Sequence, residues 1–203
     1  MIPLSDVIPR RQRPYVTLSL VAAHFAAYAI QRVALDLPGA LFDYGVVPAR
    51  LQWSTVLTAT FVHGSFMHVA VNLLFLWLFG PTVEDRTGHR RFLLFYTMGG
   101  ITTALAYAAM HAESMLPFVG TTGAVATVLG AYLVLYHRSL ILLLIPIPGL
   151  PIVELPVLLI AGMWVAVQIL TGWLTATVAG LLFGAAAILL FRRRERMQIG
   201  WWM

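Results

Sequence analysis

The amino-acid sequence predicts an all-α polytopic membrane protein, a bundle of six transmembrane helices in a single domain over residues 1–203. Of the 203 residues, 60% are hydrophobic and 10% charged, and the mean hydropathy is +0.86. A chain this apolar cannot hide its nonpolar surface in a water-soluble core. A bilayer of roughly 30 Å needs about 20 apolar residues per helix. Six apolar stretches, whose bounds are defined to within a few residues, lie at 15–35, 67–83, 92–110, 122–136, 153–170 and 174–191.

Proline and glycine mark the breaks between these stretches. Residues 36–39 follow the first stretch, Gly80-Pro81 is expected near the end of the second helix, and Pro117 precedes the fourth helix. A proline-rich linker at 146–151 separates the fourth and fifth helices. The break at Thr171-Gly172 is so short that the last two helices must form a tight hairpin.

Arginine alone supplies the positive charge, because the sequence has no Lys, and the net charge is +5. The arginines cluster at the ends of apolar stretches, so we interpret them as orientation signals rather than as a nucleic-acid surface. Only two of them, Arg32 and Arg50, fall on the outer side of the predicted bundle. The positive-inside rule therefore predicts a cytoplasmic N-terminal segment (1–14) and a basic cytoplasmic tail (192–203), which requires an even number of spans.

The longest connection, 36–66, mixes prolines and apolar residues with Tyr44 and Trp53. Aromatic rings with polar edges settle at membrane interfaces, so we expect a structured interfacial loop on the outer side. A plain tether is the alternative.

Metal and cofactor chemistry finds little support in the sequence. No Cys is present, and no HExxH motif occurs. His63 and His68 are five residues apart, which turns them to different faces of a helix, so we expect no metal ligand set and no cofactor. His68 and Asn72, four residues apart, share one face, either as a functional pair or as a polar pair satisfied between helices.

Thr122 follows Gly120 and Thr121 at the start of the predicted fourth helix. With Ser in its place this segment would read as a nucleophile loop, because the exposed amides of a helix start can hold an oxyanion. Small residues also let helices touch. Close helix packing is therefore an equal explanation for the glycines near the site and on the last helix: Gly120, Gly123, Gly130, Gly180 and Gly184.

Together these residues resemble the rhomboid intramembrane serine proteases and their inactive relatives, from about residue 52 to residue 191. The resemblance rests on ordered motifs, which are Phe61-Val62-His63-Gly64-Ser65-Phe66-Met67-His68, Asn72, Leu76-Trp77-Leu78-Phe79-Gly80, Val83-Glu84-Asp85-Arg86-Thr87-Gly88, Gly120-Thr121-Thr122-Gly123, Leu129-Gly130-Ala131-Tyr132 and Ala176-Thr177-Val178-Ala179-Gly180. It implies a six-helix bundle whose water-filled cavity opens outward.

The resemblance places Thr122 where the family has its nucleophilic Ser, and Thr177 where it has the general-base His. His68 and Asn72 match the family's oxyanion contributors. Thr127 stands where the family usually has Gly, which we expect to loosen the contact between the fourth and sixth helices.

Both members of the catalytic dyad are therefore substituted. A hydroxyl needs a neighbouring base in order to attack, and Thr177 cannot accept a proton at neutral pH. Loss of either dyad member costs on the order of 10⁶ in turnover in subtilisin. We expect His68 on the opposite side of the cavity from Thr122, and the remaining histidines on other helices or in loops. The two threonines are expected to bond to each other or to helix carbonyls.

The sequence therefore predicts a pseudoprotease that binds transmembrane helices of other membrane proteins within the lipid bilayer. A fixed structural subunit of a larger complex, docked with help from the Trp201-Trp202 tail, is the alternative. Residual proteolysis by Thr122 is less favoured, and a transporter lacks aligned intramembrane charges, since Glu154 and Gln168 are scattered. The Arg-only, Ala-rich composition indicates a bacterial inner membrane.

Overall fold

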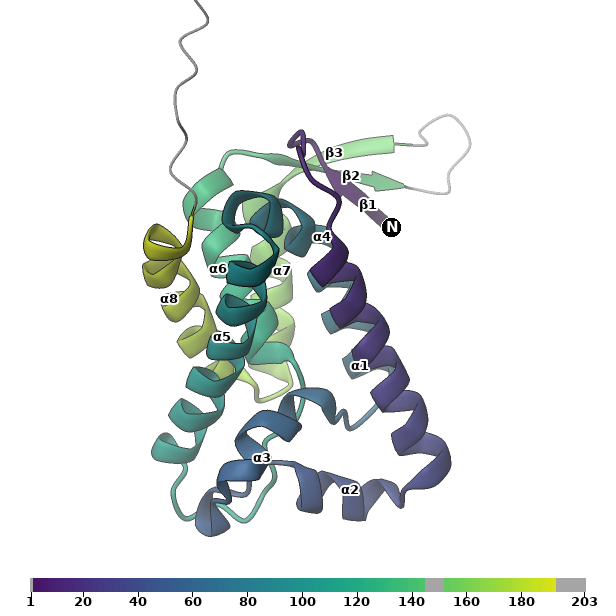
Figure 1. Cartoon of the computed structure of the whole chain (residues 1–203), viewed down its shortest axis with the longest axis vertical. Coiled ribbons are helices and arrows are strands. Elements are labelled where there is room, and N and C mark those ends of the chain that lie inside the picture. Colours follow the sequence, from purple (N-terminus) through teal and green to yellow (C-terminus); the bar gives the residue numbers. More distant parts are fainter. Residues whose placement is uncertain (1, 145–151, 193–203) are drawn as a thin grey trace, which may run out of the picture.

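The computed structural model describes residues 2–144 and 152–192, which form a bundle of helices with a small sheet at one end (Figure 1). The helices are α1 (Tyr15–Ala34), α2 (Leu37–Tyr44), η1 (Pro48–Arg50), α3 (Trp53–Thr58), η2 (Ala59–Phe61), α4 (Phe66–Thr87), α5 (His89–Met110), α6 (Thr122–Tyr136), α7 (Val157–Leu170) and α8 (Leu174–Phe191). The strands are β1 (Ile2–Asp6), β2 (Leu140–Leu144) and β3 (Ile152–Pro156).

Four of these helices, α1, α4, α5 and α8, are long and apolar enough to cross a membrane. The apolar helices α6 and α7 are shorter, at 15 and 14 residues. Each of the six predicted apolar stretches overlaps one of these six helices. The count of six spans and the cytoplasmic position of both termini stay predictions. Gly80-Pro81 does not end the second helix, because α4 continues through Pro81 to Thr87.

The structure is mostly helical, as predicted, but the all-α prediction omits a three-stranded sheet. Its strands are antiparallel in the order β1-β2-β3, so the N-terminal segment pairs with the connection between α6 and α7. The predicted fifth helix, 153–170, therefore begins as a strand, and α7 starts only after Pro156. The proline-rich linker 146–151 and residues 193–203 of the predicted tail, with Trp201-Trp202, lie outside the described residues.

The N-terminal segment is held by buried carboxylates. Asp6 accepts hydrogen bonds from Thr82 Oγ1 (2.6 Å), Tyr132 Oη (2.9 Å) and Arg10 Nη2 (3.2 Å). Nearby, the Glu84 carboxylate accepts from the backbone amides of the first turn of α1, where the positive end of a helix dipole favours an anion.

The opposite end of the bundle carries the 36–66 connection, folded into α2, η1, α3 and η2 (Figure 1). Asp36 caps α2, because its Oδ2 accepts from the Gly39 amide at 3.1 Å. Val46 and Phe118 exchange two backbone hydrogen bonds, at 2.9 and 2.7 Å, which fasten this connection to the segment before α6. Its place at the outer membrane interface stays a prediction.

Helix α6 lies at the centre and positions the site. Residues 122–132 of α6 are all buried, and its backbone lies against that of α8. A Cβ on Gly184 would overlap the carbonyl of Thr127, and one on Gly130 would overlap the carbonyl of Leu181. These two helices can approach so closely only because the residues between them lack side chains.

Candidate functional site

The side chain of Thr122 lies at the first turn of α6 and is 0% exposed. Its Oγ1 lies 3.1 Å from His68 Nε2 and also 3.1 Å from Asn72 Nδ2, which donates to it. The prediction that His68 lies across the cavity from Thr122 is therefore wrong. The three side chains form one hydrogen-bonded cluster that joins α4 to α6.

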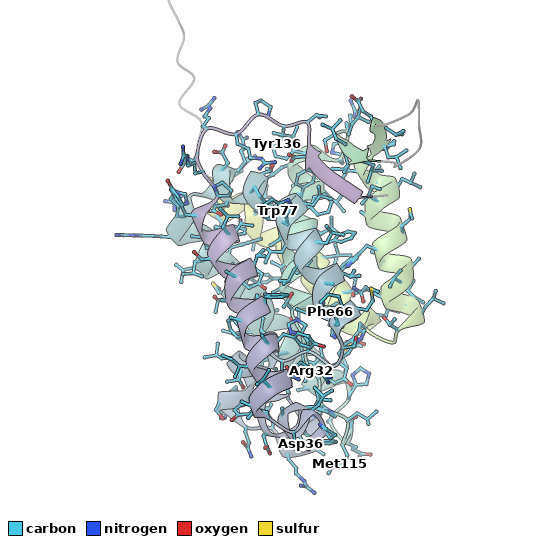
Figure 2. The ribbon with its side chains drawn as sticks, turned by 90° about the vertical axis from the view of Figure 1, so that its right-hand side faces the viewer. Arg32, Asp36, Phe66, Trp77, Met115 and Tyr136 are labelled. Carbon is cyan, nitrogen blue, oxygen red and sulfur yellow. The ribbon has the colours of Figure 1, made fainter. Side chains whose placement is uncertain are left out.

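The chain places His68 and Asn72 through the start of α4. Ser65 caps this helix, since its Oγ accepts from the His68 amide at 3.1 Å. The spacing of four residues then stacks His68 and Asn72 on the same face. Figure 2 shows Phe66, the first residue of α4, set back from the end of the molecule marked by Asp36 and Met115.

Gly120 is required beside this cluster for two reasons. Its φ is +99°, a conformation that residues with a Cβ rarely adopt. A Cβ there would also lie 2.8 Å from His68 Nε2, too close for the imidazole ring. The Gly120 amide donates to Ala59 O at 2.8 Å, so it is already engaged within the protein rather than turned toward Thr122.

Thr177 does not join the cluster. Its Oγ1 donates to Trp173 O at 2.9 Å, within α8 and the turn before it. Among the described residues, Thr122 and Thr177 do not form the hydrogen bond to each other that was one of the two expectations. The other expectation, a hydrogen bond to a helix carbonyl, is met by Thr177. Trp173 in turn stacks on the His68 ring, with centroids 5.3 Å apart and planes at 28°.

The glycines of α6 and α8 are packed as follows. A Cβ on Gly180 would overlap the carbonyl of Gly123, while one on Gly123 would overlap the Thr103 side chain of α5. Thr127 turns its side chain toward Gly99 of α5 and donates to Gly123 O at 3.0 Å. The expectation that Thr127 loosens the contact of α6 with α8 is therefore wrong, because its side chain faces another helix.

Behind His68 lies a row of buried imidazoles that sequence reasoning missed. The ring centroids of His63 and His68 are 5.3 Å apart, and those of His24 and His63 are 5.9 Å apart. Tyr96 Oη lies 2.8 Å from His24 Nε2. Gln31 fixes His63 by donating to its carbonyl at 2.9 Å and accepting from its amide at 3.1 Å.

Burial favours the uncharged form of His63, the middle imidazole of this row. Burial, with smaller contributions from His68 and His24, lowers the pKa of His63 from 6.5 to about 3. A signal for this row exists in the sequence, because His24 and Gln31 are seven residues apart on one face of an otherwise apolar helix. Within residues 2–144 and 152–192, no group of three His, Cys, Asp or Glu side chains is arranged to hold a metal ion.

A pocket of about 250 Å³ opens beside the cluster, between the first turns of α4 and the last turn of α7. His68 and Asn72 line it from one side, and Gln168 from the other. Its full lining is Ser65, Met67, His68, Val71, Asn72, Val167, Gln168, Thr171 and Trp173.

Four apolar helices long enough to cross a membrane, packed around a buried polar cluster at the start of α6, are typical of a polytopic membrane protein. Residues 50–194 match the rhomboid domain, so the chain belongs to the rhomboid family and the resemblance seen in the sequence is confirmed. That family is one of integral membrane proteins, which agrees with the four long apolar helices.

Curated relatives include both bacterial and mitochondrial proteins. The chain is 38% identical over 96 residues to the rhomboid protease GluP of Bacillus subtilis, covering 46% of this chain and 18% of that protein. It is 31% identical over 162 residues to the presenilin-associated rhomboid-like protein A of Danio rerio, a mitochondrial protein, covering 72% and 41%. It is 28% identical over 130 residues to the mitochondrial rhomboid protein 1 of Saccharomyces cerevisiae, covering 62% and 34%. The chain thus spans less than half the length of each of these three.

Proposed function

We propose that this rhomboid-family protein is non-proteolytic and binds transmembrane segments of other membrane proteins. The observation that carries the proposal is that Asn72 Nδ2, an expected oxyanion donor, is bonded to the buried Thr122 hydroxyl, while Thr177 bonds to Trp173 O and not to Thr122. The groups that would stabilise an oxyanion are thereby used to hold the position of the nucleophile. Thr177, at the position of the family's base, has no basic nitrogen and bonds to its own helix region.

Amide hydrolysis requires hydrogen-bond donors for the oxyanion as well as a proton acceptor. Donors must lie about 2.7–3.1 Å from the place where the carbonyl oxygen becomes negative. His68 and Asn72 are directed at Thr122 Oγ1 instead, the Gly120 amide is bonded to Ala59, and Trp173 covers the His68 ring. A substrate carbonyl would have to displace several of these contacts before attack, which favours binding without chemistry.

The pocket between α4 and α7 supports the binding part of the proposal. Helix α7 touches the bundle along one stripe, formed by Val157, Ala161, Trp164 and Gln168, while its other faces are mostly exposed. A transmembrane helix of another protein can therefore lie along α7 and reach the pocket from the bilayer. In this proposal all six apolar helices span a bacterial inner membrane, and the sheet lies on the cytoplasmic side.

The test combines binding and cleavage on one set of single-span proteins reconstituted in liposomes with the purified chain. Photo-crosslinking through α7 reports binding, and gel electrophoresis reports cleavage. We expect crosslinks without cleavage, unchanged by Thr122→Ala. The matched variant Thr122→Ser/Thr177→His restores the family dyad and serves as the positive control for cleavage. Native mass spectrometry from the membrane distinguishes a mixed set of clients from one stoichiometric partner, which would indicate a fixed subunit.

One observation favours a second candidate, residual proteolysis. Because His68 Nε2 lies 3.1 Å from Thr122 Oγ1, the imidazole is within reach of the hydroxyl proton. In this reaction Thr122 Oγ1 attacks the carbonyl carbon, His68 takes the proton and passes it to the leaving amine, and water then hydrolyses the acyl-enzyme. Cleavage that disappears in both Thr122→Ala and His68→Phe, but persists in Thr177→Val, would establish this activity and overturn the non-proteolytic proposal.

A further inference from the structure

The pocket between α4 and α7, of about 250 Å³, is large enough for a side chain. It is lined by the first turns of α4, the last turn of α7 and the turn that follows α7. About one turn beyond Asn72 and Gln168, Phe75 of α4 and Trp164 of α7 stack on each other with ring centroids 5.3 Å apart, so the two helices are in contact there. A helix of another protein can therefore lie over the pocket and insert one side chain into it.

The pocket holds a polar atom whose hydrogen-bonding capacity is unused. Asn72 is 1% exposed, and its Nδ2 donates to Thr122. Its Oδ1 has no hydrogen-bond partner among the described residues. A buried acceptor without a hydrogen-bond partner is unfavourable, so a donor from a bound molecule would be stabilising there.

The opposite wall offers a second carboxamide. Gln168 is 4% exposed and lines the pocket from α7. Its Oε1 accepts only a long hydrogen bond, of 3.5 Å, from Thr171 Oγ1. Two carboxamides thus face one small space from the two helices that border it.

The chemistry of the lining selects a neutral guest. No Asp or Glu lines the pocket, so an inserted Lys or Arg would lie in the membrane without a counter-charge. A carboxylate guest would place its charge beside the Asn72 oxygen. An Asn or Gln side chain, in contrast, carries both a donor for Asn72 Oδ1 and an acceptor for the Gln168 amide.

We infer that this protein selects transmembrane segments that carry one Asn or Gln side chain, which inserts between Asn72 and Gln168. The inference rests on the proposed binding function and names its client class. Asn72 lies six residues after the start of α4, or about 9 Å along that helix. The carboxamide of the client is therefore placed about six residues from the outer end of its transmembrane segment.

The test measures binding of labelled Leu/Ala-rich single-span peptides to the purified protein in nanodiscs by energy transfer. One peptide carries Gln six residues from its outer end, a second carries Leu there, and a third carries the Gln seven residues further in. We expect the first peptide to bind about three- to tenfold more tightly than the other two, the range for hydrogen bonds between helices in membranes. This preference should disappear in Asn72→Leu and in Gln168→Leu.

Gly162→Ala is the control, because it also lies on α7 but has open space around it, and it should keep the full preference. Thermal unfolding checks that Asn72→Leu and Gln168→Leu fold, and the comparison of peptides on the unaltered protein does not depend on either variant. Equal binding of all three peptides, or a preference that survives both pocket variants, overturns the carboxamide inference while the binding function stands. Failure of every peptide to bind overturns both.

Discussion

Replacing Glu84 should destabilise the fold more than most single substitutions at a polar position. Glu84 is 1% exposed, and its carboxylate accepts from Val16 N at 2.9 Å, Thr17 N at 2.7 Å and Thr17 Oγ1 at 2.6 Å. His89 Nδ1 approaches the same carboxylate. One side chain of α4 thus accepts hydrogen bonds from the backbone amides in the first turn of α1 and also contacts the first residue of α5.

The magnitude follows from these contacts. Hydrogen bonds to a charged group contribute about 1.5–3 kcal/mol each, and an anion at a helix start adds about 0.3–1 kcal/mol. Glu84→Gln keeps the shape of the side chain but directs an NH₂ group toward the donors of α1. At least one hydrogen bond is therefore lost, and one donor is left buried without an acceptor. We expect a loss of about 3 kcal/mol in the free energy of unfolding, and about 3–5 kcal/mol for Glu84→Ala.

The assay is unfolding in mixed detergent micelles, followed by tryptophan fluorescence. Asp85→Asn is the matched control, because the neighbouring carboxylate accepts from the Arg11 and Gln12 amides at 2.9 and 2.8 Å but is only half-buried. It should cost about 1 kcal/mol. A Glu84→Gln protein whose unfolding free energy stays within about 0.5 kcal/mol of the unaltered protein would refute this reasoning.

Three further outcomes are expected. Gly184→Ala should lower the free energy of unfolding by about 1–3 kcal/mol, because the new methyl group would overlap a carbonyl of α6. Gly162→Ala, where the methyl group meets open space, should be neutral or stabilising. Similar melting temperatures for the two variants would contradict this prediction. The folded pKa of His63, about 3, lies below its unfolded value of 6.5, so its contribution is complete above pH 6.5 and is lost as the pH falls toward 3. At pH 5 the free energy of unfolding is lower by about 2 kcal/mol for this reason. When the free energy of unfolding is measured as a function of pH, its decrease at acid pH should be shallower in His63→Gln than in the unaltered protein. Thr177→Val should change unfolding by less than about 1 kcal/mol, since it loses only a bond to Trp173 O; a larger loss would indicate a role in the cluster.

The helices could be predicted because their signal is local. Each apolar stretch is long enough to satisfy its own backbone hydrogen bonds in a membrane, so 174–191 coincides with α8 residue for residue. The sheet could not be predicted in the same way. Leu140–Leu144 is a run of five apolar residues, and its partners lie at Ile2–Asp6 and Ile152–Pro156. β2 and β3 are close in sequence, but β1 and β2 are separated by most of the chain, and pairing over that distance leaves no periodic trace in either strand.

The site was harder to predict because its key contact is also long-range. Thr122 and His68 are 54 positions apart, and the residue types alone do not say whether an imidazole in an oxyanion position also reaches the hydroxyl. Similarly, the direction of the Thr127 side chain depends on the rotation of α6 between α5 and α8. A substitution at a family glycine position does not reveal which neighbour receives the new side chain.

The bond between Asp6 and Tyr132 has a consequence for biogenesis. The two residues are 126 positions apart, and at about 5–20 residues per second a ribosome needs roughly 6–25 s to travel from one codon to the other. During that interval Asp6 lacks the Tyr132 hydroxyl, and β1 lacks β2. Strand β1 therefore reaches its final place only after β2 has been synthesised, so slower translation between the two positions lengthens the time that β1 spends without its partner strand.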